Sequence, residues 1–174
     1  MEGAALIAEG DAMKIGGHGL REHIRLLMPL FGLITAVWLL RLIMDKAGTP
    51  PAIVRVASVT VAGAASILLA VLLIHFKAFG SYGNVVVAAF LLEFCSQFLI
   101  CSAIAFSALT NTMNVYSLPE YSPRAGPLAH IFGHITFGVG MGTLVGAAMG
   151  CLLLWLLRHI VPAAGGKAHL RTSH

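Results

Sequence analysis

Residues 129–158, AHIFGHITFGVGMGTLVGAAMGCLLLWLLR, decide the fold that we expect for this chain. From Ile131 to Leu157 the stretch carries no formal charge, and a helix of these 27 residues is roughly 40 Å long. Because the hydrocarbon core of a bilayer is about 30 Å thick, such a helix can span a membrane with some tilt. The stretch therefore predicts an integral membrane protein.

Glycine recurs at every fourth position of this stretch, at Gly138, Gly142, Gly146 and Gly150. Residues four apart lie above one another on a helix, so these glycines form one smooth row, which we call the glycine row. Membrane helices use such GxxxG repeats, or glycine zippers, where two backbones come close. The glycine row predicts close packing, either against another span of the same chain or against a second subunit.

The composition of the whole chain agrees with a membrane protein. Of 174 residues, 58% are hydrophobic and only 10% are charged, whereas soluble domains carry about 25% charged residues. The charges lie almost wholly outside the apolar runs, so we interpret them as orientation signals and expect no nucleic-acid partner. The cysteines all fall inside apolar segments, which favours buried thiols over disulfides.

Four apolar runs predict an all-α membrane protein, a four-transmembrane-helix bundle that forms one domain over residues 20–158. The spans are expected at about 26–44, 53–74, 85–109 and 131–157. A polar, Gly-rich segment, 1–19, precedes this domain, and a basic, His-containing tail, 159–174, follows it.

The ends of the first and third spans carry further signals. Leu20, Ile24 and Leu27 share one face, which predicts a short N-terminal amphipathic interfacial helix ahead of the first span. At the far end of the first span, Arg41 is expected to reach the membrane interface and to contact Asp45 one turn further on. Residue Asn84 is expected to cap the third span.

An even number of spans places both termini on one side of the membrane. That side would carry seven of the eleven lysines and arginines: Lys14, Arg21, Arg25, Lys77, Arg158, Lys167 and Arg171. The positive-inside rule then predicts cytoplasmic termini, in a bacterial inner membrane. Acidic residues near the start predict no cleavable signal peptide, and Met13 is an alternative start to Met1.

Glu93 lies inside the third span, about 12 Å along the helix from Val85. An ionised carboxylate at this depth is costly, so burial favours the neutral acid unless a partner is present. Ser96 and Gln97 follow on the same face. We expect Glu93 either to be structural, through hydrogen bonds to these neighbours, or to carry protons or a cation; an ion pair with another subunit is a third alternative.

His130 and His134 extend the glycine row towards the start of the last span. Two ligands are fewer than a structural metal site needs, and no other span offers a histidine at this depth. We therefore expect no metal or haem within one chain, although a site shared between subunits stays open. His134 and Glu93 should differ in depth by roughly 10 Å of a ~30 Å core, which leaves room for a proton path through Gln97 and water.

These patterns favour a non-enzymatic function. The sequence has no nucleophile–base pair, phosphate loop or dinucleotide-binding motif, so neither catalytic residues nor a cofactor is expected. We expect a small membrane subunit that packs through the glycine row into a homo- or hetero-oligomeric complex in the lipid bilayer. The alternatives are a proton- or cation-coupled channel or transporter that uses Glu93, and a haem- or metal-binding electron-transfer anchor.

Overall fold

The computed structural model describes residues 14–118 and 126–161, and these ranges are helical without a β-strand. Four helical segments are long and apolar enough to cross a membrane, which confirms the predicted all-α four-helix membrane bundle. The elements in order are α1 (Leu20–Lys46), α2 (Pro51–Val54), α3 (Val59–Phe76), α4 (Tyr82–Thr110), α5 (Gly126–Gly133), a π-helical turn η1 (His134–Val139) and α6 (Gly140–Ile160). Most of the predicted segment 1–19 and of the tail 159–174 lies outside the described residues.

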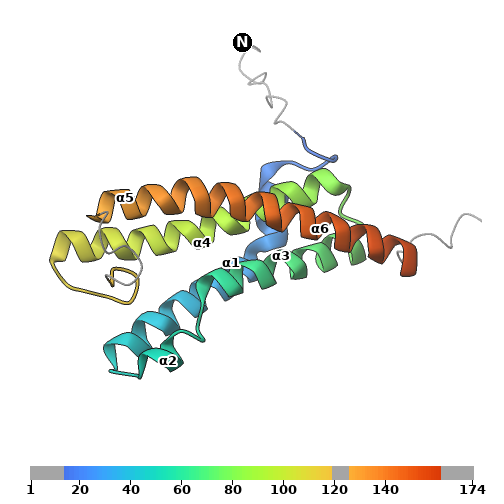
Figure 1. The fold of residues 1–174 in the computed structure, drawn as a ribbon. Coiled ribbons are helices and arrows are strands. Elements are labelled where there is room, and N and C mark those ends of the chain that lie inside the picture. Colours follow the sequence, from blue (N-terminus) through green and yellow to red (C-terminus); the bar gives the residue numbers. More distant parts are fainter. Residues whose placement is uncertain (1–13, 119–125, 162–174) are drawn as a thin grey trace, which may run out of the picture.

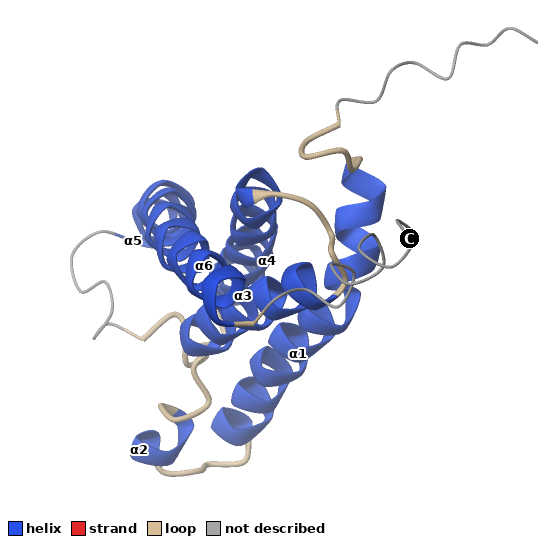
Figure 2. Cartoon of the chain, turned by 90° about the vertical axis from the view of Figure 1, so that its right-hand side faces the viewer, coloured by secondary structure: helices blue, strands red, loops and turns tan. Residues whose placement is uncertain are grey.

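The last span, made of α5, η1 and α6, lies along α4 (Figure 1). The helices α3 and α4 are central, because α3 contacts α1, α4 and α6, and α4 contacts every other span. Among the described residues α1 packs on α3 and α4 but not on α6, and Figure 2 shows it on the far side of α3 from the last span. At one end of the bundle, α2 and the end of α1 diverge from α4 and α5 (Figure 1).

The first span differs from the expectation, because the interfacial helix is not a separate element. A single helix runs through Leu20–Lys46, although Pro29 lies inside it. Its first turn is closed by Glu22, whose carboxylate accepts a hydrogen bond from the Gly19 N–H at 2.8 Å. The buried side chains of Leu26, Leu30 and Ile34 continue along one face past the proline, so the same packing stabilises both halves.

The second span covers Pro51–Phe76, which includes the predicted range 53–74, but its helix is interrupted. The chain forms the one-turn helix α2, leaves the helical conformation over residues 55–58, and begins again at α3. Ser58 caps α3, since its hydroxyl accepts a hydrogen bond from the Val61 N–H.

The expected cap of the third span was also wrong. Helix α4 begins at Tyr82 after Ser81, so Asn84 lies inside the helix. Its side chain is fully buried, receives a hydrogen bond from His23 Nε2 at 3.0 Å and donates one to the Phe79 carbonyl at 2.8 Å. Asn84 therefore ties α1 to the connection between α3 and α4.

The glycine row packs within the chain. A Cβ added to Gly146 would lie 2.6 Å from Ile67 Cδ1, and one added to Gly150 would lie 2.7 Å from Val85 Cγ1. These distances are too short for a real Cβ, so the glycines allow α6 to approach α3 and α4 closely. Of the two expected uses of the row, the structure has packing against the same chain; association with a second subunit stays a prediction.

This packing predicts that Gly146→Leu destabilises the bundle by about 1–3 kcal/mol, because the new side chain would overlap Ile67. Gly140→Leu is the matched control, since nothing lies within 4 Å of a Cβ added to Gly140. The free energy of unfolding of both variants is measured by reversible unfolding in mixed detergent micelles. Equal free energies of unfolding for the two would contradict the packing role of the glycine row.

Candidate functional site

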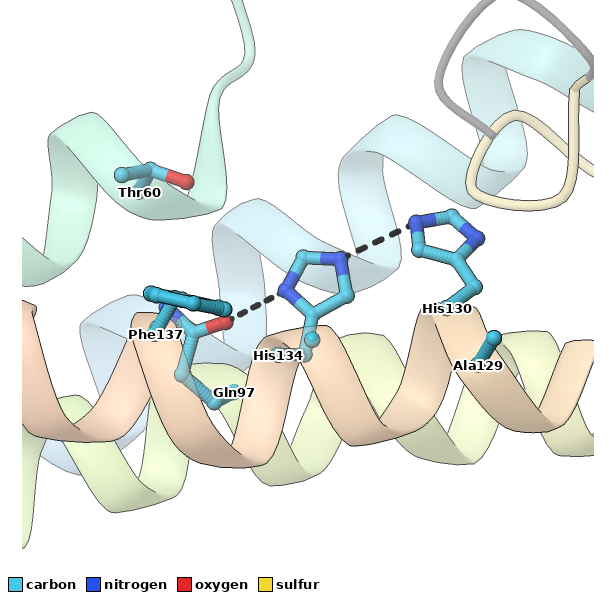
Figure 3. Close-up of a pocket in the computed structure, with 8 residues that line it drawn as sticks. Thr60, Gln97, Ala129, His130, His134 and Phe137 are labelled. Atoms are coloured by element: carbon cyan, nitrogen blue, oxygen red, sulfur yellow. Dashed lines mark hydrogen bonds between the residues drawn. The ribbon is translucent and has the colours of Figure 1, made fainter. Parts of the chain in front are cut away.

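Four polar side chains from α4 and the last span form one hydrogen-bonded row, which we call the polar row: Glu93, Gln97, His134 and His130. Gln97 Nε2 donates to Glu93 Oε2 at 3.4 Å, and Gln97 Oε1 lies 2.7 Å from His134 Nδ1. The row ends where His134 Nε2 meets His130 Nε2 at 3.2 Å (Figure 3). The Gln97 side chain thus bridges the depth that separates Glu93 from the histidines through direct hydrogen bonds.

The glycine row makes room for the carboxyl and amide groups of the polar row. Glu93 and Gln97 lie one turn apart on the inner face of α4 and are only 5% and 4% exposed. A Cβ added to Gly142 would lie 2.8 Å from Glu93 Cδ, and one added to Gly138 would lie 2.6 Å from Gln97 Cδ. Two of the four predicted packing glycines therefore cover the two predicted intramembrane polar residues, a link that the sequence analysis missed.

Ser96 lies beside the polar row but makes no hydrogen bond to it. Its buried hydroxyl donates to the Leu92 carbonyl of its own helix at 3.0 Å. It also faces α3, where a Cβ added to Gly63 would lie 2.7 Å from Ser96 Oγ. In the structure Ser96 therefore contributes to the contact between α3 and α4.

The two histidines stand where the last span changes its helical form. The π-helical turn η1 begins at His134, directly after α5. Thr136 stabilises this turn, because its hydroxyl donates to the Phe132 carbonyl at 2.8 Å and so satisfies an acceptor near the irregular turn. Single π-helical turns often occur at functional sites. The nearest signal in the sequence is Thr136 between Gly133 and Gly138, which by itself does not predict a π-helical turn.

The hydrogen bonds of the polar row have a direction. With Gln97 Oε1 towards His134, the imidazole Nδ1 must carry the proton, and its Nε2 is then an acceptor. His130 Nε2 must in turn be the donor to His134. Every donor therefore points towards Glu93, whose carboxyl group can accept the hydrogen bond from Gln97 in its neutral or its ionised form. The arrangement can hold one extra proton either on Glu93 or on the histidine pair.

The histidine end of the polar row lines a cavity of about 620 Å³, together with Thr60, Phe137 and Gly138 (Figure 3). A smaller cavity of about 130 Å³ also touches Thr60, His130 and His134. Its remaining wall is formed by Arg41, Ile100, Val115 and Tyr116. The histidines are thus reached from cavities near the start of the last span, whereas Glu93 lies beneath α6.

Within residues 14–118 and 126–161 no three His, Cys, Asp or Glu side chains lie close enough together to hold a metal ion. His130 and His134 bond to each other in the polar row. No family model, curated protein or solved structure matches this chain.

The polar row predicts the outcome of Gln97→Leu. Loss of the bridging amide leaves buried groups on Glu93 and His134 without partners, so the free energy of unfolding should fall by about 1–3 kcal/mol. Nitrogen NMR of labelled histidine should show His134 protonated at Nδ1 in the wild type and altered in the variant. Ser102→Ala, on the same helix but outside the row, should change neither measurement, and a matching effect there would contradict the bridging role.

Proposed function

We propose that this chain is a proton-coupled membrane protein in which Glu93 accepts the proton and the polar row delivers it. The observation that supports the proposal is the unbroken series of hydrogen bonds from Glu93 to His130 inside an apolar bundle. Ionisable side chains within a bilayer are costly, and they commonly mark proton or ion pathways. A purely structural carboxyl group needs one buried partner, whereas this row continues through two imidazoles to a cavity.

The surroundings of Glu93 favour a coupled transporter over an open channel. Beyond the carboxylate, α3, α4 and α6 meet through buried apolar side chains, among them Ile67, Val71, Val85 and Ala89. The polar row therefore reaches Glu93 from one end of the bundle only. Because Gly142 covers the carboxyl group, gain or loss of the proton changes the charge directly beneath the contact between α4 and α6. That contact is where proton binding would alter helix packing.

We further propose an orientation with both termini in the cytoplasm of a bacterial cell, in its inner membrane. The supporting observations are the four spans and the excess of lysine and arginine on the side of the termini. The start of the last span, with His130 and the cavities, would then face the outside of the cell. Protons would enter the polar row from that side.

Infrared spectroscopy of oriented proteoliposomes tests the proton site. A protonated-carboxyl band should titrate when pH is changed on the α5 side alone, and Glu93→Gln should remove it. His134→Phe should slow the titration by about a hundredfold, because a positioned acid–base group is lost. Glu22→Gln is the control, since an amide can still accept the hydrogen bond from the Gly19 N–H. A band that never titrates would show that Glu93 is only structural.

A second candidate function, a subunit of an oligomeric membrane complex, is favoured by the exposure of the last span. Only 17% of its most apolar window is buried within the chain, compared with 28–44% for the other spans. Large apolar side chains cover its outer face, among them Leu144, Met149 and Leu152. Because the chain's own helices occupy the glycine row, a partner helix would pack on this outer face.

Native mass spectrometry in mild detergent tests this second candidate. The complex should be larger than one chain, and Leu152→Trp should lower its abundance by placing extra bulk on the outer face of α6. Phe98→Trp is the matched control, because Phe98 is 60% exposed but lies on α4 and not on α6. A monomer under all conditions would overturn the candidate.

A further inference from the structure

The smaller cavity has a positive charge on its wall. Arg41, on α1, lines this cavity, and its guanidinium lies over the Tyr116 ring at 4.8 Å from the ring centroid. Stacking uses the face of the guanidinium and leaves its N–H donors at the edge available. Arg41 Nε is buried and has no hydrogen-bond partner among the described residues.

Within residues 14–118 and 126–161 no carboxylate oxygen lies within ion-pair distance of Arg41. The expected contact with Asp45 is absent, because Asp45 Oδ2 instead accepts a hydrogen bond from the Val115 N–H at 3.1 Å. The charge on the cavity wall is therefore not balanced by the part of the chain that the structure describes.

Tyr116 adds a neutral donor to the same wall. The residue is only 5% exposed, and its phenol oxygen is buried beside Arg41 without a well-formed hydrogen bond in the described chain. Burial raises the pKa of Tyr116 to about 12, although the nearby Arg41 charge acts in the opposite direction. The phenol thus keeps its proton at neutral pH, and it can donate that proton in a hydrogen bond.

The rest of the cavity suits a small acid. Thr60, His130 and His134 supply further polar atoms to the lining, whereas Ile100 and Val115 are apolar. The volume of about 130 Å³ equals roughly four water molecules at their share of the liquid volume. A carboxylate with a short apolar group, or a phosphate, matches this size and lining.

We propose that this cavity binds a small oxyanion, with Arg41 as the charged ligand and Tyr116 as a neutral donor. A guanidinium pairs with two oxygens of a carboxylate or phosphate at once, which a lysine cannot do. The oxyanion is either a free acid or the phosphate of a lipid headgroup. This proposal does not rest on the proposed proton function. Anion binding is measured at equilibrium and at one pH, so its result does not depend on proton transfer through the polar row. If both proposals hold, the anion binds next to the His130 end of the polar row.

Calorimetric titration of the full chain in phosphatidylcholine nanodiscs, with propionate and inorganic phosphate as probes, tests the site. We expect saturable binding of one probe per chain, weakened about tenfold or more by Arg41→Gln and several-fold by Tyr116→Phe. Arg25→Gln is the matched control, because it removes the same charge from an exposed site at the other end of α1. Circular dichroism and a monodisperse elution profile establish that each variant is folded.

Nanodiscs with phosphatidylglycerol separate the two sources of the oxyanion. If a lipid phosphate occupies the cavity, this lipid should suppress probe binding and stay attached to wild type, but not to Arg41→Gln, in native mass spectrometry. If a free acid is the ligand, probe binding should be equal in both lipids. The proposal is overturned if wild type binds neither probe and retains no anionic lipid, or if Arg41→Gln binds as well as wild type.

Discussion

The burial of one carboxyl group, Glu93, in an apolar bundle is the constraint on which the rest of the structure depends. A charge or an unpaired acid at this place would cost several kcal/mol, so the fold must supply a polar partner. Gln97 supplies it from the next turn of α4, and the last span leaves room for both groups because glycines face them. The close packing of the last span on α4 and the polar site within the bundle therefore depend on the same contacts, with glycines on the last span and polar side chains on α4.

The sequence was sufficient to predict the four spans, because long uncharged runs have few other folds. It did not predict how the spans begin. The face formed by Leu20, Ile24 and Leu27 was interpreted as a separate interfacial helix, but buried packing carries α1 through Pro29. Asn84 resembled a cap, yet its side chain joins α1 to a loop. Both errors arose because local propensity was overridden by contacts between segments distant in the sequence.

The members of the polar row were all named from the sequence, but their connection was not. Counting residues gives the depth of a Cα along its own helix, and it ignores the reach of a glutamine side chain towards a neighbouring helix. The direct bridge from Gln97 to His134 therefore had to come from the structure. Tyr116 was beyond prediction for a different reason. It lies in a connection after α4, and only the folded chain brings it beneath Arg41.

The π-helical turn η1 sets the angular phase between the two halves of the last span. In an uninterrupted α-helix, positions four apart drift by about 40° per step, so His130 and Gly150 would end on nearly opposite sides. A wider turn rotates the other way over four residues and offsets part of this drift. Deleting one residue there would swing the imidazoles by about 100° relative to the glycines and separate the acid–base groups from the helix contact.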